Sequence, residues 1–377
     1  MARAAELEIL GTDRDSDWRD ILDEIGRHDF CHLVEYSRLA EQSGQGRAEL
    51  LVWRDGPGLL ALPVLFRLID VELYPKVDGV WTDVSSVYGY AGPIANLPEV
   101  SGALSRDFMH AVDEYFHSRR AVSAFNRMHP LLDQRAMLAS LGEIVPVGRT
   151  VSLDLTQPEE AQRAAYRRNH RQDIEHLKAM GVVCSEVGLD GLDDFVEMYW
   201  ENMDRVGAAR RYYFSRAYFE ALLTEMKDTV HLFMCHYDGR PISGSIFTHC
   251  RGIVQWWLSG SRSEFDGPPA AKLLFDHGRH WAVEQGAEVL HLGGGVGSRQ
   301  DSLHHFKRGF TKREHVYLNW RHIVNEELYG ELVRSRREAT GLNPDEDFFP
   351  RYRHPAFDDP GALRARSARV GPEQKGE

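Results

Sequence analysis

The sequence contains few lysines: only seven of its 45 Lys and Arg residues are lysine, and the formal net charge is −12. A protein that coats nucleic acid is normally basic over its whole surface, so this charge excludes that class. A local basic patch remains compatible with it. Because lysines are so scarce, each lysine that falls within a motif is of interest.

Cysteine is also scarce, and the four cysteines form no Cys-x-x-Cys pair. Their wide separation argues against both a disulfide framework and a cysteine zinc site, and it favours a reducing, cytoplasmic environment. The four residues are Cys31, Cys184, Cys235 and Cys250.

Long hydrophobic runs are absent, since no stretch approaches the ~20 apolar residues that a membrane helix needs. Residues 1–8 have no positive flank followed by an apolar stretch, so we expect no secretory signal. A composition that is 42% hydrophobic and 27% charged is typical of a globular protein with substantial cores. At roughly 100–200 residues per domain, a chain of 377 residues predicts two domains.

The first part of the chain has the pattern of a mixed α/β unit. The expected strands are residues 50–53, 59–68 and 122–125, and the expected helices are residues 30–40 and 106–119. Before the second helix lies the aromatic and glycine-rich loop Tyr88-Gly89-Tyr90-Ala91-Gly92-Pro93.

The second part repeats this order of strand, helices, hairpin-linked strands, helix and strand. The expected strands are residues 150–155, 182–186, 230–237, 240–250, 253–259 and 288–292. The expected helices are residues 158–180, 192–205, 216–227 and 268–285, with Gly181 and Gly286 as C-terminal caps. The hairpin turn at Asp238-Gly239 links two of the strands.

The repeated order resembles a duplicated acetyltransferase-like (GNAT) unit. We therefore predict an α/β (α+β) fold with two tandem GNAT domains, each a mixed central sheet flanked by helices. The expected divisions are a first domain at 1–149, a second domain with the transfer site at 150–318, a segment packing back on the first domain at 319–357, and a polar tail at 358–377 that we expect to be disordered.

The most specific stretch is residues 292–310, where a strand runs into the glycines Gly293, Gly294, Gly295 and Gly297. Glycines let the backbone approach a ligand closely, and N–H groups in such a turn can hold an anion. Asp301 or Ser302 then caps a short helix that presents Phe306-Lys307. The structural alternative is a tight turn with a solvent-facing lysine, but the continuation Asp-x-x-x-x-Phe-Lys-x-x-Phe favours a functional role.

This stretch resembles the Fem family (FemA, FemB and FemX) of non-ribosomal peptidyl transferases within the acetyltransferase-like superfamily. Further segments agree in the same order along the chain, and the resemblance covers roughly residues 30–355. These segments are Tyr88–Pro93, Arg167–Arg171, Trp256–Ser261 and Phe348–Arg353.

The resemblance implies transfer of an amino acid from aminoacyl-tRNA to an amine, which in the family is typically part of a peptidoglycan precursor. Phe306-Lys307 is similar to the family's Phe-Lys pair, whose lysine is thought to lie near the reacting ester and the tRNA end. An ammonium there could stabilise the developing oxyanion or hold the terminal phosphate. Because the ester is already activated, the reaction requires no metal, nucleotide triphosphate or other cofactor.

The residue that takes the proton from the amine is left open by the sequence. Asp301, His304 and His305 are close enough in sequence to be candidates. Paired histidines at a helix start are also common as surface residues or cap partners, and the substrate itself could assist the loss of the proton.

A basic segment opens the second domain. Arg167, Arg171 and Lys178 fall on one face of the expected helix, next to Arg168. These four residues could contact tRNA phosphates, and the alternative is a solvated basic face.

Candidate acceptor-binding residues carry guanidinium groups or flat rings that suit phosphate, carboxylate or sugar groups. At least one of the two tryptophans must instead be plain core, because successive strand residues point to opposite faces. The candidates are Tyr88, Tyr90, Arg205, Arg210, Tyr213, Trp256 and Trp257, together with Gly294 and Gly295 of the turn.

Two features depart from the Fem pattern. Peptidoglycan-building members usually carry a lysine early in the first domain that helps bind a nucleotide diphosphate, and only Arg47 lies near that place. The long helical arm of some members is also missing. Both departures favour a smaller acceptor, such as an antibiotic-like amine or peptide.

The main alternative is an N-acyltransferase that uses acetyl-CoA or another acyl-CoA. Such enzymes hold the pyrophosphate on backbone N–H groups at a helix start. Here Pro268 and Pro269 remove two of these donors, and Glu264 and Asp266 add negative charge.

A third alternative is a non-catalytic binding protein of the same fold. The sequence leaves the oligomeric state and the identity of the amino acid open.

Overall fold

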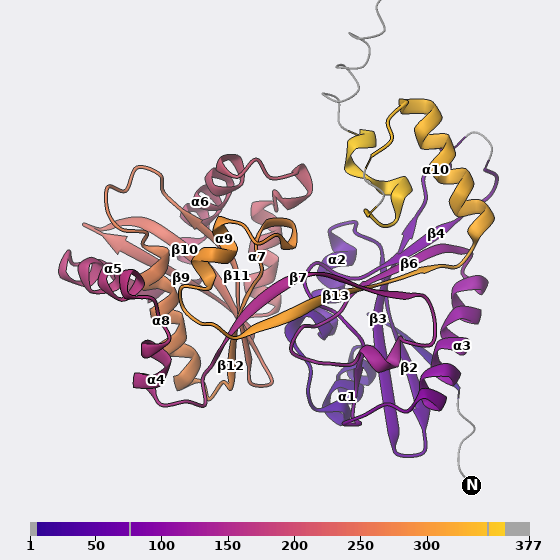
Figure 1. Cartoon of the computed structure of the whole chain (residues 1–377), viewed down its shortest axis with the longest axis horizontal. Helices are drawn as coiled ribbons and strands as arrows, with labels where there is room; N and C mark the ends of the chain where they lie inside the picture. Colours follow the sequence, from indigo (N-terminus) through magenta and orange to yellow (C-terminus); the bar gives the residue numbers. More distant parts are fainter. Residues whose placement is uncertain (1–5, 75–76, 345–346, 359–377) are drawn as a thin grey trace, which may run out of the picture.

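The computed structural model describes residues 6–74, 77–344 and 347–358, so most of the tail expected from residue 358 lies outside the described residues. Figure 1 shows two lobes, each with a sheet and surrounding helices, joined by two long strands. The first lobe contains β1 (Leu7–Gly11), α1 (Asp15–Ile25), α2 (Val34–Gln42), β2 (Arg47–Asp55), β3 (Gly58–Leu68), β4 (Thr82–Ser85), β5 (Ile94–Ala95), α3 (Gly102–Ser118) and β6 (Ala121–Arg127).

The chain then forms β7 (Glu143–Asp154), the first of the long strands, and enters the second lobe. This lobe contains α4 (Glu159–Ala164), α5 (Arg168–Ala179), β8 (Val183–Glu186), α6 (Leu192–Arg205), α7 (Arg216–Glu225), β9 (Val230–Tyr237), β10 (Arg240–Cys250), β11 (Ile253–Ser261), α8 (Ala271–Glu284), β12 (Val289–Gly293) and α9 (Ser302–Lys307). The second long strand, β13 (Glu314–Ile323), returns to the first lobe and leads into α10 (Glu326–Thr340).

All strands of the described residues join one mixed sheet, in the order β1-β2-β3-β4-β6-β13-β7-β12-β11-β10-β9-β8, with β5 beside β3. β13 lies between β6 and β7, so the two lobes share a hydrogen-bonded ladder. The prediction of an α/β fold with mixed sheets and flanking helices is confirmed.

Successive strand residues point to opposite sides of the sheet, so both faces carry apolar side chains. Helices cover both faces and bury these side chains. On β10, Ile246 packs in a cluster with α6 and α7, and the next residue, Phe247, packs in a second cluster with α8. In the first lobe, α3 and α1 bury the two faces of β2 and β3 in the same way. The α6–α7 cluster also includes Phe30 and Tyr36 of the first lobe, which packs the lobes against each other.

The segment after Asn319, which is polar in composition, is largely ordered. Tyr329, Leu332 and Val333 of α10 are buried against Val122 of β6. Further on, the hydroxyls of Tyr352 and Ser123 lie 2.8 Å apart, and the Arg353 guanidinium pairs with the buried carboxylate of Asp83. These contacts attach the end of the described chain to the first lobe.

Two expected helices differ from the structure. The helix predicted at 158–180 is broken, because Tyr166 is buried with its hydroxyl 3.1 Å from Asp276 and the Arg167 N–H donates to the Gly309 carbonyl at 2.7 Å. The helix predicted at 30–40 begins as a 3₁₀ turn at Phe30–His32, which is capped by Asp29, and continues as α2. In both places tertiary contacts override the local pattern.

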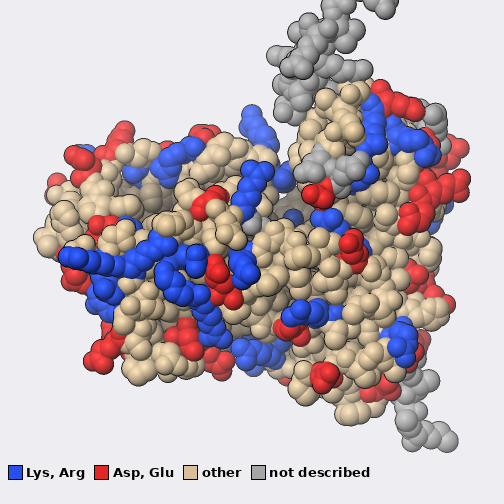
Figure 2. Space-filling model, viewed as in Figure 1, with Lys and Arg blue, Asp and Glu red and all other residues tan. Residues whose placement is uncertain are grey.

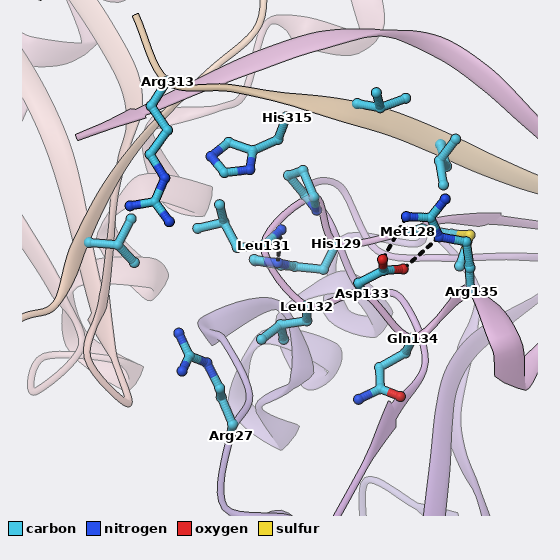
Figure 3. Close-up of a pocket in the computed structure, with 14 residues that line it drawn as sticks. Arg27, Met128, His129, Leu131, Leu132, Asp133, Gln134, Arg135, Arg313 and His315 are labelled. Atoms are coloured by element: carbon cyan, nitrogen blue, oxygen red, sulfur yellow. Dashed lines mark hydrogen bonds and ion pairs between the residues drawn. The ribbon is translucent and has the colours of Figure 1, made fainter. Parts of the chain in front are cut away.

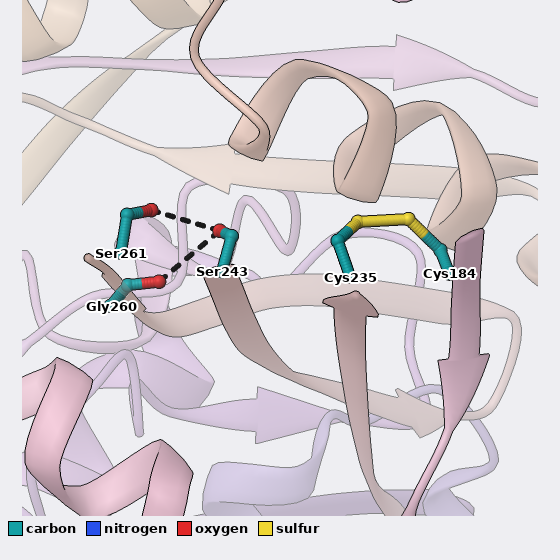
Figure 4. The surroundings of a disulfide bond; sticks show 5 residues. All are labelled: Cys184, Cys235, Ser243, Gly260 and Ser261. Carbon is teal, nitrogen blue, oxygen red and sulfur yellow. Dashed lines mark hydrogen bonds between the residues drawn. A yellow bond between two sulfur atoms is a disulfide. The ribbon is translucent and has the colours of Figure 1, made fainter. Parts of the chain in front are cut away.

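The expectation that the cysteines remain unpaired is wrong for two of them. Cys184 on β8 and Cys235 on β9 form a disulfide (Figure 4). They are 51 residues apart in sequence but directly opposite each other in the antiparallel ladder. Cys31 and Cys250 are free and buried.

Within the described residues, no helix is long and apolar enough to cross a bilayer, and no three His, Cys, Asp or Glu side chains are grouped to hold a metal ion.

Candidate active site

The glycine-rich turn follows β12 and depends on the absence of side chains. Gly293 has a φ of +69°, and a Cβ there would lie 3.4 Å from the Lys307 Nζ and 3.6 Å from the Tyr90 hydroxyl. A Cβ on Gly294 would lie 2.8 Å from the Arg149 carbonyl oxygen, and a Cβ on Gly295 would collide with the Arg299 carbonyl. The turn therefore brings backbone from β12 directly beside Lys307 and Tyr90.

Asp301 builds this turn. Its carboxylate accepts hydrogen bonds from the Val296 N–H at 2.8 Å and the His304 N–H at 2.9 Å, and so caps α9. Burial raises the pKa of Asp301, but these backbone hydrogen bonds outweigh it and lower the pKa below its usual range. Both oxygens are thus engaged by the backbone, and Asp301 does not line the pocket described below.

Lys307, at the end of α9, points back toward the turn. Its Nζ donates a hydrogen bond to the Gly294 carbonyl at 2.8 Å, which leaves two N–H groups for a ligand. Burial lowers its pKa to about 8, and Asp301 opposes this shift only in part. Among the described residues, no carboxylate lies within ion-pair distance of Nζ. Phe306 is fixed beside it by the rings of His170 and Trp256, with centroids 5.3 and 6.0 Å away.

A cavity of about 720 Å³ opens from Lys307 at the junction of the two lobes. Tyr88, Tyr90 and Arg127 enter it from the first lobe, and Tyr317 enters it from β13. The second lobe supplies the remaining wall, from α6, β11, the start of α8, the glycine turn and α9. We refer to this cavity as the junction pocket.

The junction pocket gathers most of the candidates that the sequence indicates. The predicted residues that line it are Tyr88, Tyr90, Arg205, Trp256, Trp257, Gly294, Gly295, Phe306 and Lys307. Trp256 is nevertheless largely core, with 7% of its surface exposed, as expected for one of the two tryptophans.

Five other catalytic or acceptor-binding candidates lie outside the lining. Arg210 is exposed, and the Tyr213 hydroxyl donates to Asp204 at 2.7 Å. His305 is exposed and contacts Arg167 on the outer surface, while Asp301 caps α9. His304 is buried with its Nε2 3.3 Å from Glu314, so it also faces away from the pocket.

The lining also contains residues that were not among the sequence candidates, including Arg127, Tyr199 and Tyr317. Arg127 carries the clearest signal, since it is a charged residue directly after the buried strand predicted at 122–125. Tyr199 and Tyr317 alternate with core residues on their elements and have no such signal.

A buried polar network supports the wall behind Tyr90. The carboxylate of Asp29 lies 2.9 Å from the His129 Nε2 and accepts hydrogen bonds from the side chain of Gln255 and the N–H of Phe30. Burial raises the pKa of Asp29, but the bonds from His129 and Gln255 outweigh it and lower the pKa. Because Gln255 lines the junction pocket, this network fixes a polar group in its wall.

A second, smaller cavity of about 390 Å³ lies beside β13 and shares no lining residue with the first (Figure 3). Each of its arginines already faces an acid: Arg135 lies 2.6 Å from Asp133, and Arg27 and Arg313 lie 3.6 and 3.4 Å from Glu288 and Asp154. Its charges are therefore compensated within the chain.

The residues of the predicted basic segment differ in whether they have partners within the chain. Arg171 donates to the Tyr166 carbonyl at 2.8 Å, and Lys178 lies 3.7 Å from both Glu175 and Asp276. Figure 2 shows a band of basic side chains across the second lobe. Arg167 and Arg308 lie near Lys312, and Arg168 is exposed at the start of α5. We call these four residues the α5–α9 basic surface.

Comparison with known proteins confirms the fold. Residues 164–308 match the family model described as an acetyltransferase (GNAT) domain. A crystal structure of FemX is 14% identical and superposes with a TM-score of 0.64, covering 86% of this chain and 99% of FemX.

Two further structures have the same architecture. The structure of L-PGS from Bacillus licheniformis is 13% identical with a TM-score of 0.50, over 86% of this chain and 97% of that one. A conserved protein of unknown function from Bacteroides thetaiotaomicron is 9% identical with a TM-score of 0.51, over 85% and 99% of the two chains. No curated protein matches the sequence. Residues 164–308 are thus similar to a GNAT domain, and along most of its length the chain has the fold of FemX, so the predicted Fem resemblance holds at the level of fold.

Proposed function

We propose that the protein is an aminoacyltransferase that moves an amino acid from aminoacyl-tRNA to an amine of a small peptidic, antibiotic-like or cell-wall-precursor acceptor. The observation that carries this proposal is Lys307, an ammonium without a carboxylate partner that faces a large pocket beside a glycine turn. Such a group stabilises negative charge that develops on an ester oxygen.

The transfer needs no external oxidant or cofactor. The acceptor nitrogen attacks the ester carbonyl carbon, a C–N bond forms, and the C–O bond to the ribose breaks. The nitrogen loses one proton and the leaving ribose oxygen gains one, while an acceptor that starts as an ammonium releases a further proton to solvent. Lys307 stabilises the oxyanion of the intermediate, and Tyr90 and Gly293 position the reacting groups against it.

The α5–α9 basic surface supports tRNA as the donor. Arg168 is exposed and has no ion-pair partner among the described residues, and Arg167 and Arg308 both lower the pKa of Lys312, after the larger effect of burial. Glu314 pairs with Arg308 at 3.0 Å, whereas Arg167, Arg168 and Lys312 have no ion-pair partner among the described residues. Cations that lie together with so little compensation favour binding of a polyanion. Because Arg308 of this surface directly follows Lys307 at the end of α9, a tRNA end bound on the surface would reach the junction pocket.

The second candidate is an acyl-CoA-dependent N-acyltransferase, which the acetyltransferase description of the matched domain favours. The pocket does reach the start of α8, where Pro269 and Ala270 line it. However, Pro268 and Pro269 lack N–H donors there, and the nearby Lys272 is buried in an ion pair with Asp173. This helix start is therefore poorly suited to a pyrophosphate.

The test supplies a panel of amines and short peptides with either charged tRNA or acetyl-CoA and measures amide formation. We expect product from charged tRNA that disappears after RNase treatment. Product from acetyl-CoA that is insensitive to RNase would instead establish the second candidate, and product from neither donor would support a non-catalytic binding protein.

A further inference from the structure

The charges that line the junction pocket are all positive. Arg127, Arg205, Arg262 and Lys307 line it, and no aspartate, glutamate or histidine of the described chain does. Arg262 is compensated from outside by Glu197 at 2.8 Å, and Arg205 donates only to the neutral side chains of Asn202 and Ser263. An acceptor with no charge other than its ammonium would be repelled by this lining.

Arg127 is the least compensated of these cations. It ends β6, is half-buried, and has no carboxylate within ion-pair distance among the described residues. It lines the pocket together with Tyr88, Tyr90 and Tyr317, and its guanidinium lies 5.2 Å from the centroid of the Phe125 ring. Burial raises the pKa of each of the three tyrosines, and Arg127 lowers it in part. A half-buried guanidinium surrounded by aromatic rings lacks both full hydration and a counter-ion.

Tyr90 links this guanidinium to the reacting centre. Its ring contacts Tyr317 at a centroid distance of 5.2 Å, and its hydroxyl and the Lys307 Nζ both lie beside Gly293. A group bound by Arg127 would thus lie in the same part of the pocket as the ester that Lys307 addresses. Arginine donors form a fork that matches the two oxygens of a carboxylate or phosphate.

We propose that the acceptor is an amine that also carries an oxyanion, a carboxylate or a phosphate, within a few bonds of the reacting nitrogen, and that Arg127 binds this oxyanion. The inference rests on the proposed transfer reaction and adds the class of acceptor to it. An amino acid, a short peptide with a free carboxylate and an aminoalkyl phosphate all have this chemistry. Arg127 would then select the acceptor and hold its amine toward the ester.

The test compares acceptors in pairs that differ in one anionic group: glycine with glycinamide, glycylglycine with its amide, and phosphoethanolamine with ethanolamine. We expect the anionic member of at least one pair to have a kcat/KM about 10- to 100-fold higher, as for a hydrogen bond to a charged group. The carboxylate and phosphate pairs together identify which oxyanion is used. In Arg127→Gln the ratio of kcat/KM for the anionic acceptor to that for the neutral one falls close to one, mainly through KM. Arg127→Lys restores part of this ratio.

Arg262→Gln is the matched control, because it removes a pocket arginine whose charge Glu197 already neutralises. We expect it to leave the preference for the anionic acceptor in place. Transfer to neutral amines at equal or higher kcat/KM would overturn the inference and leave the proposed function standing. An equal loss of preference in Arg262→Gln would overturn the specific role of Arg127.

A binding measurement separates failure of the inference from failure of the reaction. Saturation-transfer NMR with glycylglycine, phosphoethanolamine and their neutral counterparts needs no donor and no turnover. We expect the anionic probe of one pair to bind, and Arg127→Gln to abolish that binding. If the protein transfers nothing but still binds the anionic probe through Arg127, the oxyanion site stands without the proposed reaction. Equal binding of both members of every pair would overturn the inference.

Discussion

At the scale of single residues, the chemistry of the site depends on the protonation of Lys307. Burial disfavours the ammonium and brings its pKa to about 8, so the positive charge is present below pH 8 and is lost as the pH rises through that value. An oxyanion-stabilising role therefore needs the protonated form, whereas a general-base role would need the neutral form.

We expect kcat to fall above pH 8 in the wild-type enzyme, after a rise at lower pH as the acceptor amine loses its proton. Lys307→Ala should lower kcat by about 100- to 1,000-fold while its circular dichroism and thermal unfolding stay near wild type. Lys307→Arg stays charged at all accessible pH values, so its pH profile should lose the falling limb.

A matched control is Lys227→Ala, which removes an exposed lysine after α7 that does not line the pocket. It should keep the wild-type rate and pH profile. A rate that instead rises through pH 8 and reaches a plateau in the wild type would contradict the oxyanion role and favour a general base.

The residue scale also shows what the sequence could reveal of the site. Lys307 and the glycines of the turn are recognisable because their order along the chain is itself the motif. Arg127 has only the weak signal of a charged residue after a buried strand, because its relation to Lys307 arises only when β6 and the end of β12 approach the same pocket from different lobes. Asp301 has the right place in the motif, but only the structure shows that both its oxygens are used by the cap.

At the scale of elements, strands and amphipathic helices follow from local patterns, as the agreement at β9, β10, β11 and α6 shows. The break between α4 and α5 does not, since it depends on the burial of Tyr166 against Phe310 from a distant turn. The break decides which basic residues face solvent: Arg168 starts α5 at the surface, while Arg171 folds back onto the carbonyls at the end of α4.

This arrangement predicts which cations bind tRNA. Each phosphate contact contributes about one unit to the slope of log K against log salt concentration, so Arg168→Ala with Lys312→Ala should lower the slope by about two and weaken binding. Lys178→Ala should leave the slope unchanged, because Lys178 is already paired with Glu175 and Asp276. Fluorescence titrations with charged tRNA at several salt concentrations measure the binding affinity and the salt slope of each variant. Equal slopes in the double variant and the wild type would show that Arg168 and Lys312 are solvent-exposed cations that do not contact tRNA phosphates.

The disulfide between β8 and β9 gives a second prediction at this scale. It joins residues 51 apart at the edge of the sheet, where β8 is paired on one side only. Closing a loop of this length restricts the unfolded chain, and we expect Cys184→Ser to lower the free energy of unfolding by about 2–4 kcal/mol. Urea unfolding with and without reductant measures this loss. Reductant should destabilise the wild type and leave Cys184→Ser unchanged; an equal effect on both would show that the bond does not contribute.

At the scale of the whole molecule, β7 and β13 make the two lobes interdependent. The boundaries predicted from the sequence, at residues 149/150 and 318/319, fall within these strands. Residues Asn319–Ile323 of β13 pair with β6 on one side, and Asn319–Arg321 also pair with β7 on the other. The junction pocket takes residues from both lobes and from β13, so its geometry depends on this shared ladder.

A fragment of residues 1–149 should therefore not fold alone. Without β13 it exposes the edge of β6, and without α10 it exposes the apolar surface around Val122 that Tyr329, Leu332 and Val333 bury. Since unpaired strands and exposed apolar faces lose both hydrogen bonds and burial, we expect poorly dispersed NMR spectra and no cooperative urea transition. Co-expression with a second fragment, residues 312–358, should restore both signals because it supplies the missing strand and helix. A dispersed spectrum and a cooperative transition from residues 1–149 alone would show instead that the first lobe is an independent domain, and that β13 only fastens the second lobe to it.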